Sequence, residues 1–408
     1  MMDITAAFND DAFKAYILEH FCEGRERIEQ ADVAHISELD VSRQGLVSLG
    51  GIEHFGRLEV LDCSYNKLTT LELDSLRELQ SLTCGGNRLT NLNTSELPLL
   101  QELNVNQNEL LALNLTANPE LEVLDCGFNR LRQLDVSGNP ALTTLTCYWN
   151  LLSELELGQN TLLQTLECGY NALFELSLVH NKSLVRLDCG HNYLSRLNLT
   201  ACAQLEELRC NHNHLTELDL SGNPTLKSLR CFNTHISELE LSHIGELAEL
   251  FCSDTKIAAL ALEQLPKLKQ LDIANTLIAY PDYPVDDVGT FVYDPAVTCY
   301  SANLDTSGQQ YAITTEASDP AAMERLAPYI QHAWQRREAL QADGLAHIAE
   351  LHPDENVSEL VMSEWMVSTE ESIRIGFEAG ETPSGHLVIY VVFDAQLERD
   401  DELVYEIY

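Results

Sequence analysis

Leucines recur every 21 residues along the middle of the chain. Three such series begin at Leu58, Leu61 and Leu68, and the third changes to isoleucine from Ile236 onward. The positions between them are largely polar, so each unit carries a fixed pattern of apolar and polar side chains. A fixed period of this length predicts a solenoid, in which every repeat buries its apolar side chains against its neighbours.

A cysteine follows the second leucine of most units by two residues. The nine cysteines in this register are Cys63, Cys84, Cys126, Cys147, Cys168, Cys189, Cys210, Cys231 and Cys252. Val105 and Ile273 fill the same register, which indicates that the position requires a small apolar side chain. We therefore expect reduced, buried thiols. Disulfides between neighbouring units stay open as an alternative, whereas the equal spacing lacks the CxxC clustering typical of zinc sites.

An asparagine lies three residues after this register, from Asn66 to Asn213, and changes to threonine from Thr234 onward. We expect the L-x-C segment of each unit to be a short strand with the leucine and cysteine inward, and the stacked strands to form a parallel sheet. The asparagine falls where the chain leaves the strand. There its amide can bond backbone groups that the turn would leave unpaired.

The consensus L-x-x-L-x-C-x-x-N-x-L-x-x-L-x-L resembles the leucine-rich-repeat superfamily. More closely, it is similar to the bacterial subclass with 21-residue repeats and a cysteine ladder, known from internalin-type surface proteins. The resemblance covers residues 39–280 and starts with an irregular copy, Leu39–Leu46, at 22-residue spacing. It implies an α/β-type solenoid dominated by β structure, a right-handed superhelix with a parallel sheet, and binding of another macromolecule.

The two ends of the repeat array predict further parts. The predicted organisation is a helical N-terminal cap at 1–38, the solenoid of about eleven repeats at 39–280, a linker and C-terminal cap at 281–310, and a small α+β domain at 311–408. In the cap, helical spacing predicts one apolar face made of Phe8, Phe13, Tyr16, Ile17 and Phe21. Residues 22–34 lack the D-x-D-G loop of similar proteins, so we expect no calcium there.

In the last domain, Asp319-Pro320 has the signature of a helix start, and we expect the helix to continue to about Gln341. Its predicted apolar face is Leu326, Ile330, Ala333 and Trp334. The predicted strands are Leu360–Ser368, Ser372–Phe377, His386–Phe393 and Leu403–Tyr408. The stretch Ile375–His386, with the ending Tyr405–Tyr408, resembles small bacterial domains often met beside toxin–immunity loci.

The net charge bears on the partner. The chain has 24 Lys and Arg against 64 Asp and Glu, a formal charge of −40, which repels phosphate backbones and anionic lipids. We expect a protein partner, with a basic protein as one possibility, and neither nucleic acid nor membrane; the acidity could equally serve solubility alone. We expect a monomer.

The chain start lacks the basic and apolar regions of a secretory signal. The longest apolar run, Leu387–Phe393, is far below the roughly 20 residues of a spanning helix. We expect a cytoplasmic location, with non-classical export as the open alternative.

Aromatic, histidine and arginine side chains gather in the columns around each strand, which are the predicted concave face. The predicted partner-binding residues are Tyr148, Trp149, Tyr170, Arg186, His191, Tyr193, Arg209, His212, His214, Arg230, Phe232, His235 and Phe251. One alternative is that these rings pack on one another and only shield the sheet. Glycines such as Gly86 and Gly127 in the same columns favour a pocketed recognition face instead. Metal binding by the stacked histidines lacks completing ligands, so we expect no metal and no cofactor.

The columns after the asparagine are acidic, as at Glu175, Glu217 and Glu238, and are predicted to be a solvated face or a second-choice site for a basic partner. Catalytic motifs such as HExxH or GxSxG do not occur, and Cys299 is the one cysteine after the solenoid, so we expect no enzyme. The predicted function is a protein interaction scaffold that uses its concave face. The alternatives are an immunity-type protein that neutralises a bacterial toxin, and an exported effector or adhesin that binds a host protein.

Overall fold

The structure is a computed structural model, and it describes residues 2–278, 280–294, 297–306, 309–353, 357, 360–382 and 385–407. The chain divides into two compact units, Met1–Leu271 and Asp272–Tyr408. We call them the solenoid unit and the C-terminal unit. Pro383, Ser384 and Tyr408, which belong to predictions made above, lie outside the described residues.

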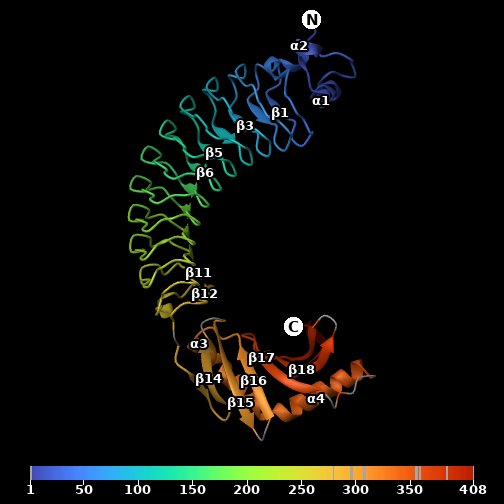
Figure 1. The fold of residues 1–408 in the computed structure, drawn as a ribbon, viewed down its shortest axis with the longest axis vertical. Coiled ribbons are helices and arrows are strands. Elements are labelled where there is room, and N and C mark those ends of the chain that lie inside the picture. The colour runs from blue at the N-terminus through green and yellow to red at the C-terminus, as the bar shows by residue number, and fades with distance from the viewer. Residues whose placement is uncertain are drawn as a thin grey trace. The chain divides into compact units, whose positions relative to one another are not determined.

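The solenoid unit is one parallel sheet of twelve strands whose order in space follows the sequence. Figure 1 shows its coils following one another along an arc, with the strands on the inner side. The strands are β1 (Glu38–Asp40), β2 (Val60–Asp62), β3 (Ser81–Thr83), β4 (Glu102–Asn104), β5 (Val123–Asp125), β6 (Thr144–Thr146), β7 (Thr165–Glu167), β8 (Arg186–Asp188), β9 (Glu207–Arg209), β10 (Ser228–Arg230), β11 (Glu249–Phe251) and β12 (Gln270–Asp272). This arrangement confirms the predicted parallel-sheet solenoid.

Each strand centres on the leucine of the repeat. Leu61 pairs with Leu82 and Leu82 with Leu103, which is the 21-residue register, whereas Leu39 pairs with Leu61 at 22 residues. Each strand ends just before the cysteine position, as β2 does before Cys63. The strands therefore lie one residue earlier than the predicted L-x-C segments. The backbone pairing nevertheless continues, because the N–H of Cys63 donates to the carbonyl of Thr83 at 2.8 Å.

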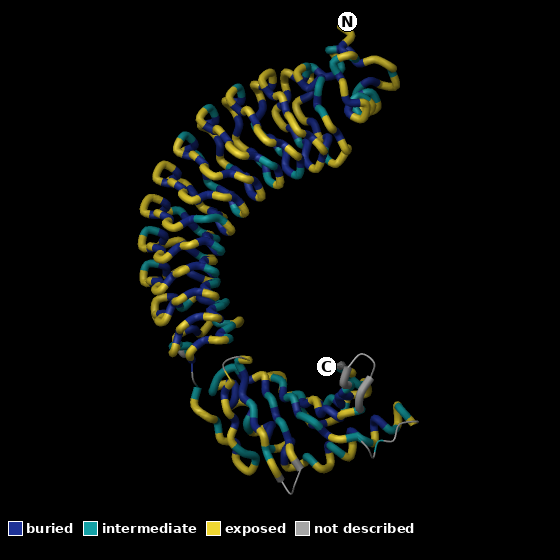
Figure 2. The backbone as a smooth tube through the Cα atoms, in the orientation of Figure 1, coloured by how far each residue is buried: buried dark blue, intermediate teal, exposed yellow. Residues whose placement is uncertain are grey.

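The interior of the coils is filled mainly by apolar side chains. Figure 2 shows buried and exposed residues alternating along each turn. All nine cysteines of the 21-residue register are fully buried free thiols. Burial raises the pKa of Cys84 and of Cys210 to about 12, since a thiolate would lose its hydration there. The prediction of hydrophobe-like thiols is confirmed by this packing.

The recurring asparagine joins each repeat to the one before it. The Nδ2 group of Asn87 donates to the carbonyls of Cys63 and Cys84 at 3.0 Å each, and its Oδ1 accepts from the N–H of Leu68 at 3.0 Å. The same set recurs from Asn66 to Asn213. Buried turn groups that belong to two successive repeats are therefore satisfied by one side chain.

Where threonine replaces the asparagine, this connection is reduced. The hydroxyl of Thr234 donates to Cys231 at 2.7 Å and that of Thr255 to Cys252 at 2.8 Å, both within the same repeat. A hydroxyl is too short to reach the preceding repeat as the amide does. The last repeats are thus stacked mainly by apolar contact and by the sheet.

The N-terminal cap comprises the short helices η1 (Thr5–Ala7) and α2 (Gln30–Val33), and the helix α1 (Asp11–Phe21). Phe8, Phe13 and Ile17 are buried as predicted, and Phe8 packs edge-on against Phe55 of the first repeat. Tyr16 and Phe21 are only partly buried.

The cap is also tied to the solenoid by a single carboxylate. One oxygen of Asp10 caps α1 by accepting from the N–H groups of Ala12 and Phe13. Its other oxygen accepts from Val47 and Ser48 in the first coil. Two further short helices, η2 (Ile52–His54) and η3 (Leu262–Gln264), lie within the coils.

The C-terminal unit is an eight-stranded sheet with the strands again in sequence order. Its strands are β13 (Tyr283–Val285), β14 (Gly289–Asp294), β15 (Cys299–Thr306), β16 (Gln309–Thr315), β17 (Val361–Val367), β18 (Ile373–Thr382), β19 (Gly385–Phe393) and β20 (Arg399–Ile407). β16 and β17 pair in parallel, and the helices α3 (Pro320–Gln335) and α4 (Arg337–Leu351) form the crossover between them. The other neighbours are antiparallel.

Two expectations for this unit were wrong. Residues 281–310 are not a linker, because β13, β14 and β15 belong to the same sheet as the strands that follow. The predicted single helix to about Gln341 is two helices, because Arg336 leaves helical geometry with φ −99° and ψ 3°. The predicted cap at Asp319 and the buried face of Leu326, Ile330, Ala333 and Trp334 are confirmed. Among the described residues, no helix is long and apolar enough to cross a membrane.

Burial of the thiols predicts their reactivity. We expect the nine ladder cysteines to resist a thiol reagent such as DTNB in the native protein near pH 8, because their raised pKa leaves almost no thiolate and the packing excludes the reagent. Unfolding in guanidinium should make them react. Rapid labelling of ladder thiols without denaturant, located by peptide mass spectrometry, would contradict the packing.

The asparagine bonds predict a graded loss of stability at Asn150. Its amide donates to the carbonyls of Cys126 and Cys147, and its Oδ1 accepts from Leu131. Asn150→Ala leaves these buried groups unpaired and should lower the free energy of unfolding by about 2–4 kcal/mol in urea titrations. Asn150→Thr should lose less, since a threonine can keep the bond within its own repeat, as Thr234 does. A threonine variant as stable as the wild type would argue against bonding between repeats.

Candidate functional site

The residue two places after the cysteine register has the same unusual backbone in all eleven repeats. Its φ lies between 50° and 66°, in the left-handed region, from Tyr65 through Trp149 to Asn275. This conformation is strained for side chains other than glycine, and here the surrounding hydrogen bonds impose it once per coil. Because the chain turns identically each time, the side chains of this column project side by side where the strands end.

Five rings of this column form one continuous stack, which we call the strand-exit stack. It consists of Phe128, Trp149, Tyr170, His191 and His212. The successive ring centroids are 5.6, 4.3, 3.9 and 3.9 Å apart, and the interplanar angles stay between 11° and 19°. Trp149 remains 48% exposed and Tyr170 39% exposed, so the stack is held by its own rings while one side of it faces solvent.

Further groups close the stack at its two ends. Tyr148 packs edge-on against Phe128 at 5.0 Å, and Phe232 packs edge-on against His212 at 5.2 Å. His212 Nδ1 also lies 2.8 Å from the amide nitrogen of Asn233. The stack is therefore bounded in sequence, and it covers the middle repeats of the solenoid.

A second, looser row of rings lies on the other side of the asparagine column. It consists of Phe174, Tyr193, His214 and His235, with centroid separations of 5.3, 5.9 and 5.9 Å. Phe174 was not among the predicted residues, although it is 62% exposed. It comes six residues after its cysteine instead of four, so a search along one register does not find it. That Phe174 belongs to this row becomes apparent only when the coils are stacked.

The structure brings the predicted rings together, and it also changes the reasoning that favoured them. The glycines of the same columns are not pockets: a Cβ on Gly86 would lie 2.6 Å from the ring of Tyr65, and one on Gly127 would lie 2.9 Å from that of Tyr148. The argument from open space between the rings was wrong. The rings pack on one another and on these glycines, and the surface that they present is continuous.

The predicted arginines lie on the strands themselves. Arg186 Nη2 is 3.4 Å from the hydroxyl of Thr165, and Arg209 Nη1 is 3.8 Å from Asp188 Oδ2. The guanidinium of Arg230 stacks over the ring of Phe251, at 4.7 Å from its centroid. These side chains share the inner face of the sheet with carboxylates, and burial raises the pKa of both Asp125 and Glu167 there.

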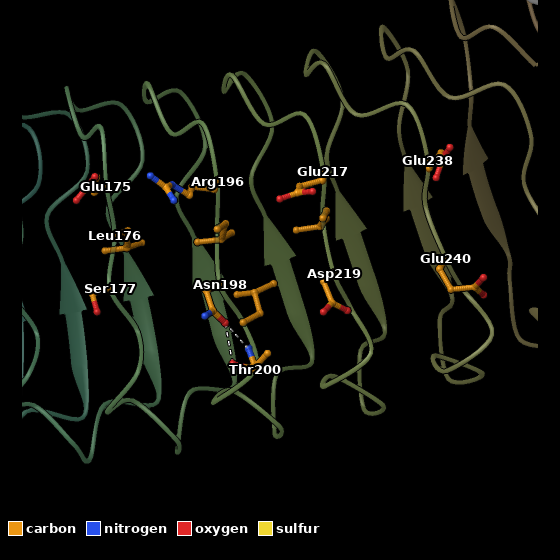
Figure 3. A pocket seen from close by; sticks show the side chains of 13 residues that line it. Glu175, Leu176, Ser177, Arg196, Asn198, Thr200, Glu217, Asp219, Glu238 and Glu240 are labelled. Atoms are coloured by element: carbon orange, nitrogen blue, oxygen red, sulfur yellow. Dashed lines mark hydrogen bonds between the residues drawn. The ribbon is translucent and has the colours of Figure 1, made fainter.

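The acidic columns border a groove of about 840 Å³ on another flank of the coil. Figure 3 shows its side chains in two rows, one with Glu175, Arg196, Glu217 and Glu238 and the other with Ser177, Asn198, Asp219 and Glu240. Part of this acidity has a structural use. Asp219 accepts from the N–H of Ser221 at 2.9 Å, and this hydrogen bonding with Ser221 holds the pKa of Asp219 below its usual value. The carboxylates of this row therefore shape the turns and also face solvent.

The histidines of the stack do not form a metal cage. Among the described residues, no group of three His, Cys, Asp or Glu side chains could hold a metal ion. His191 and His212 lie face to face, so they stack as rings do instead of converging on one point.

The stack predicts a pH effect through His191. Burial, and then the neighbouring His212, lower its pKa below the ordinary 6.5, with Asp188 opposing. The unfolded chain therefore takes up the proton first, and the free energy of unfolding should fall as the pH drops below about 6.5, and level off below the folded-state pKa. NMR titration of the His191 ring should give a midpoint below 6.5, and His191→Gln should remove this part of the pH dependence. A midpoint at or above 6.5 would contradict the stacked, neutral ring.

Comparison with solved structures identifies proteins that share this solenoid. The functional domain of InlJ from Listeria monocytogenes, which includes a cysteine ladder, is 31% identical over 69% of this chain and 72% of that chain, with a TM-score of 0.56. A leucine-rich-repeat protein of Leptospira interrogans is 23% identical over 61% of this chain and 81% of that chain, with a TM-score of 0.52.

A TDR receptor is 23% identical over 60% of this chain and 48% of that chain, with a TM-score of 0.57. At that identity the Leptospira protein and the receptor show the fold alone. No family model and no curated protein matches the chain.

Proposed function

Because the chain belongs to the internalin-like leucine-rich-repeat proteins with a cysteine ladder, we propose that it is an interaction scaffold that binds a partner protein on the inner face of its solenoid. The strand-exit stack carries this proposal. Five rings are aligned over five consecutive repeats and keep an exposed side, although the interior of the coil is already filled by leucine and cysteine. The packing of the rings on each other does not explain why they keep an exposed side, and folding alone does not require it.

The chemistry of the stack suits protein recognition. Tryptophan and tyrosine are the side chains that most often dominate protein interfaces, since they bury a large area and lose little conformational freedom. Here that freedom is already lost, because the left-handed backbone and the neighbouring rings hold each ring before any partner arrives. A preorganised surface of this kind binds at a lower entropic cost.

The fold of the relatives agrees with this proposal. One of the proteins that share the solenoid is described as a receptor, which is a binding function. The immunity and adhesin alternatives differ from the general scaffold only in the partner, a toxin or a host protein. Identifying the captured protein therefore separates them.

A double variant tests the proposal. Trp149→Ala with Tyr170→Ala removes the centre of the stack, and we expect partner capture from lysate to fall by about tenfold or more, as for the loss of interface hot spots. Val179→Ala is the matched control, because Val179 is an apolar side chain that is 60% exposed and belongs neither to the stack nor to the second row of rings. Quantitative mass spectrometry of the captured proteins gives the readout.

Both variants must fold for this comparison, and protection of the ladder thiols monitors that. Proteins retained equally by the wild type, the control and the double variant would count against the inner face as the binding surface.

A further inference from the structure

Two arginines lie in register on neighbouring strands of the inner face. Arg209 ends β9 and Arg230 ends β10, and the two residues are directly paired. Adjacent strands are about 4.8 Å apart, so two positive charges lie side by side, which is unfavourable unless an anion offsets them. The chain has 24 basic residues against 64 acidic ones, so a neighbouring pair of cations is conspicuous.

Within the chain, few negative groups offset the charges of these two arginines. Arg209 approaches Asp188 only to 3.8 Å, and no ion pair or hydrogen bond joins the guanidinium of Arg230 to another described residue. The Nε of Arg230 is buried without an acceptor. A buried donor without a partner costs free energy, and such a group indicates a missing acceptor.

Phe251 fixes the orientation of this guanidinium. The guanidinium carbon of Arg230 lies over the ring at 4.7 Å from its centroid, so the ring limits the positions that this group can take. A guanidinium held in this way presents a planar fork of donors, which matches the two oxygens of a carboxylate.

An earlier repeat of the same solenoid shows what is missing. Asn106 lies over Gly85, and its amide donates to the carboxylate of Asp125 in the next repeat at 2.8 Å. Asn211 holds the corresponding place over Gly190, but its repeat neighbour is Arg230 instead of an aspartate. The residue is 8% exposed, and its side chain makes no hydrogen bond to another described residue. The amide thus lacks the carboxylate that its counterpart has.

We propose that Arg209, Arg230 and Asn211 form a carboxylate-binding site on the inner face, which receives an acidic group of the partner. This inference rests on the proposed function and refines it. The partner then presents a carboxylate at this point, in contrast to the basic partner suggested by the net charge. Phe232, one residue beyond Cys231, and Phe251 would flank the bound carboxylate with apolar surface.

A nucleic acid is disfavoured as the source of the anion. The carboxylates that share this face, among them Glu167 and Asp188, would repel a chain of phosphates. A single planar carboxylate needs only the fork of Arg230 and the donors beside it.

The site can be tested without knowing the partner. In arginine-selective NMR of the full chain, sodium benzoate should shift and saturate the Nε–H signals of Arg230 and Arg209, while the neutral benzamide should not. Arg196, which lines the acidic groove, is the internal control and should be unaffected. An equal response to benzamide or to sodium chloride, or a response strongest at Arg196, would overturn the site.

A second arm uses the captured partner. Arg209→Gln with Arg230→Gln should weaken its binding about tenfold or more, while Arg196→Gln should not, since removing one side of a charge-assisted contact mainly speeds dissociation. Binding that survives the arginine changes but is lost with Trp149→Ala and Tyr170→Ala overturns the carboxylate site and leaves the proposed function standing. Binding that survives both pairs overturns the proposed function. Capture abolished by nuclease would identify a nucleic acid and overturn the inference.

Discussion

The hydrogen bonds from one asparagine side chain to two successive repeats are the interaction on which the solenoid depends. A three-residue strand offers few backbone bonds, and the turn that follows it would leave carbonyl and N–H groups buried and unpaired. Asn87 and its equivalents satisfy those groups. They require every repeat to have the same length, because an amide displaced from its register would not reach the backbone groups of both repeats. The period of 21 residues is thus a condition for pairing buried polar groups as much as for packing leucine.

The surface chemistry follows from the same constraint. The residue before each asparagine or its threonine replacement is forced into the left-handed region, and eleven similar turns place ten side chains and Gly86 in a row. Whether that row becomes a stack depends on its residues: Phe128, Trp149 and Tyr170 stack, while Gly86 accepts the ring of Tyr65 above it. The core therefore fixes where these exposed side chains lie, whereas it does not restrict which residues occupy the positions.

The solenoid could be predicted from the sequence because its constraints are local and repeated. The leucine, cysteine and asparagine registers each indicate a buried position, and stacking converts those positions directly into contacts. The glycines among the aromatic residues do not mark pockets, as the sequence had suggested, because contacts between repeats fill the space beside them. Gly127, for example, is covered by Tyr148 from the next coil.

The C-terminal unit lacks such repetition. The pattern located β17, β18, β19 and β20, which are four of its eight strands, yet it gave no sign that residues from Tyr283 onward join the same sheet. It also could not reveal the break at Arg336, since the residues on both sides favour a helix.

A repetitive structure also supplies its own reference for unusual positions. Each column shows how a side chain is satisfied in the ordinary repeat, so a departure can be assessed without an external comparison. The aspartate that serves Asn106 is the solution in one earlier repeat, and the arginine beside Asn211 exchanges that anion for a cation. An aspartate in place of Arg230 would make the chain more stable. Arg230 instead adds a second positive charge beside Arg209 and leaves its own Nε donor buried without an acceptor. A substitution that costs stability at this point of the array is best explained by a group that arrives from outside it.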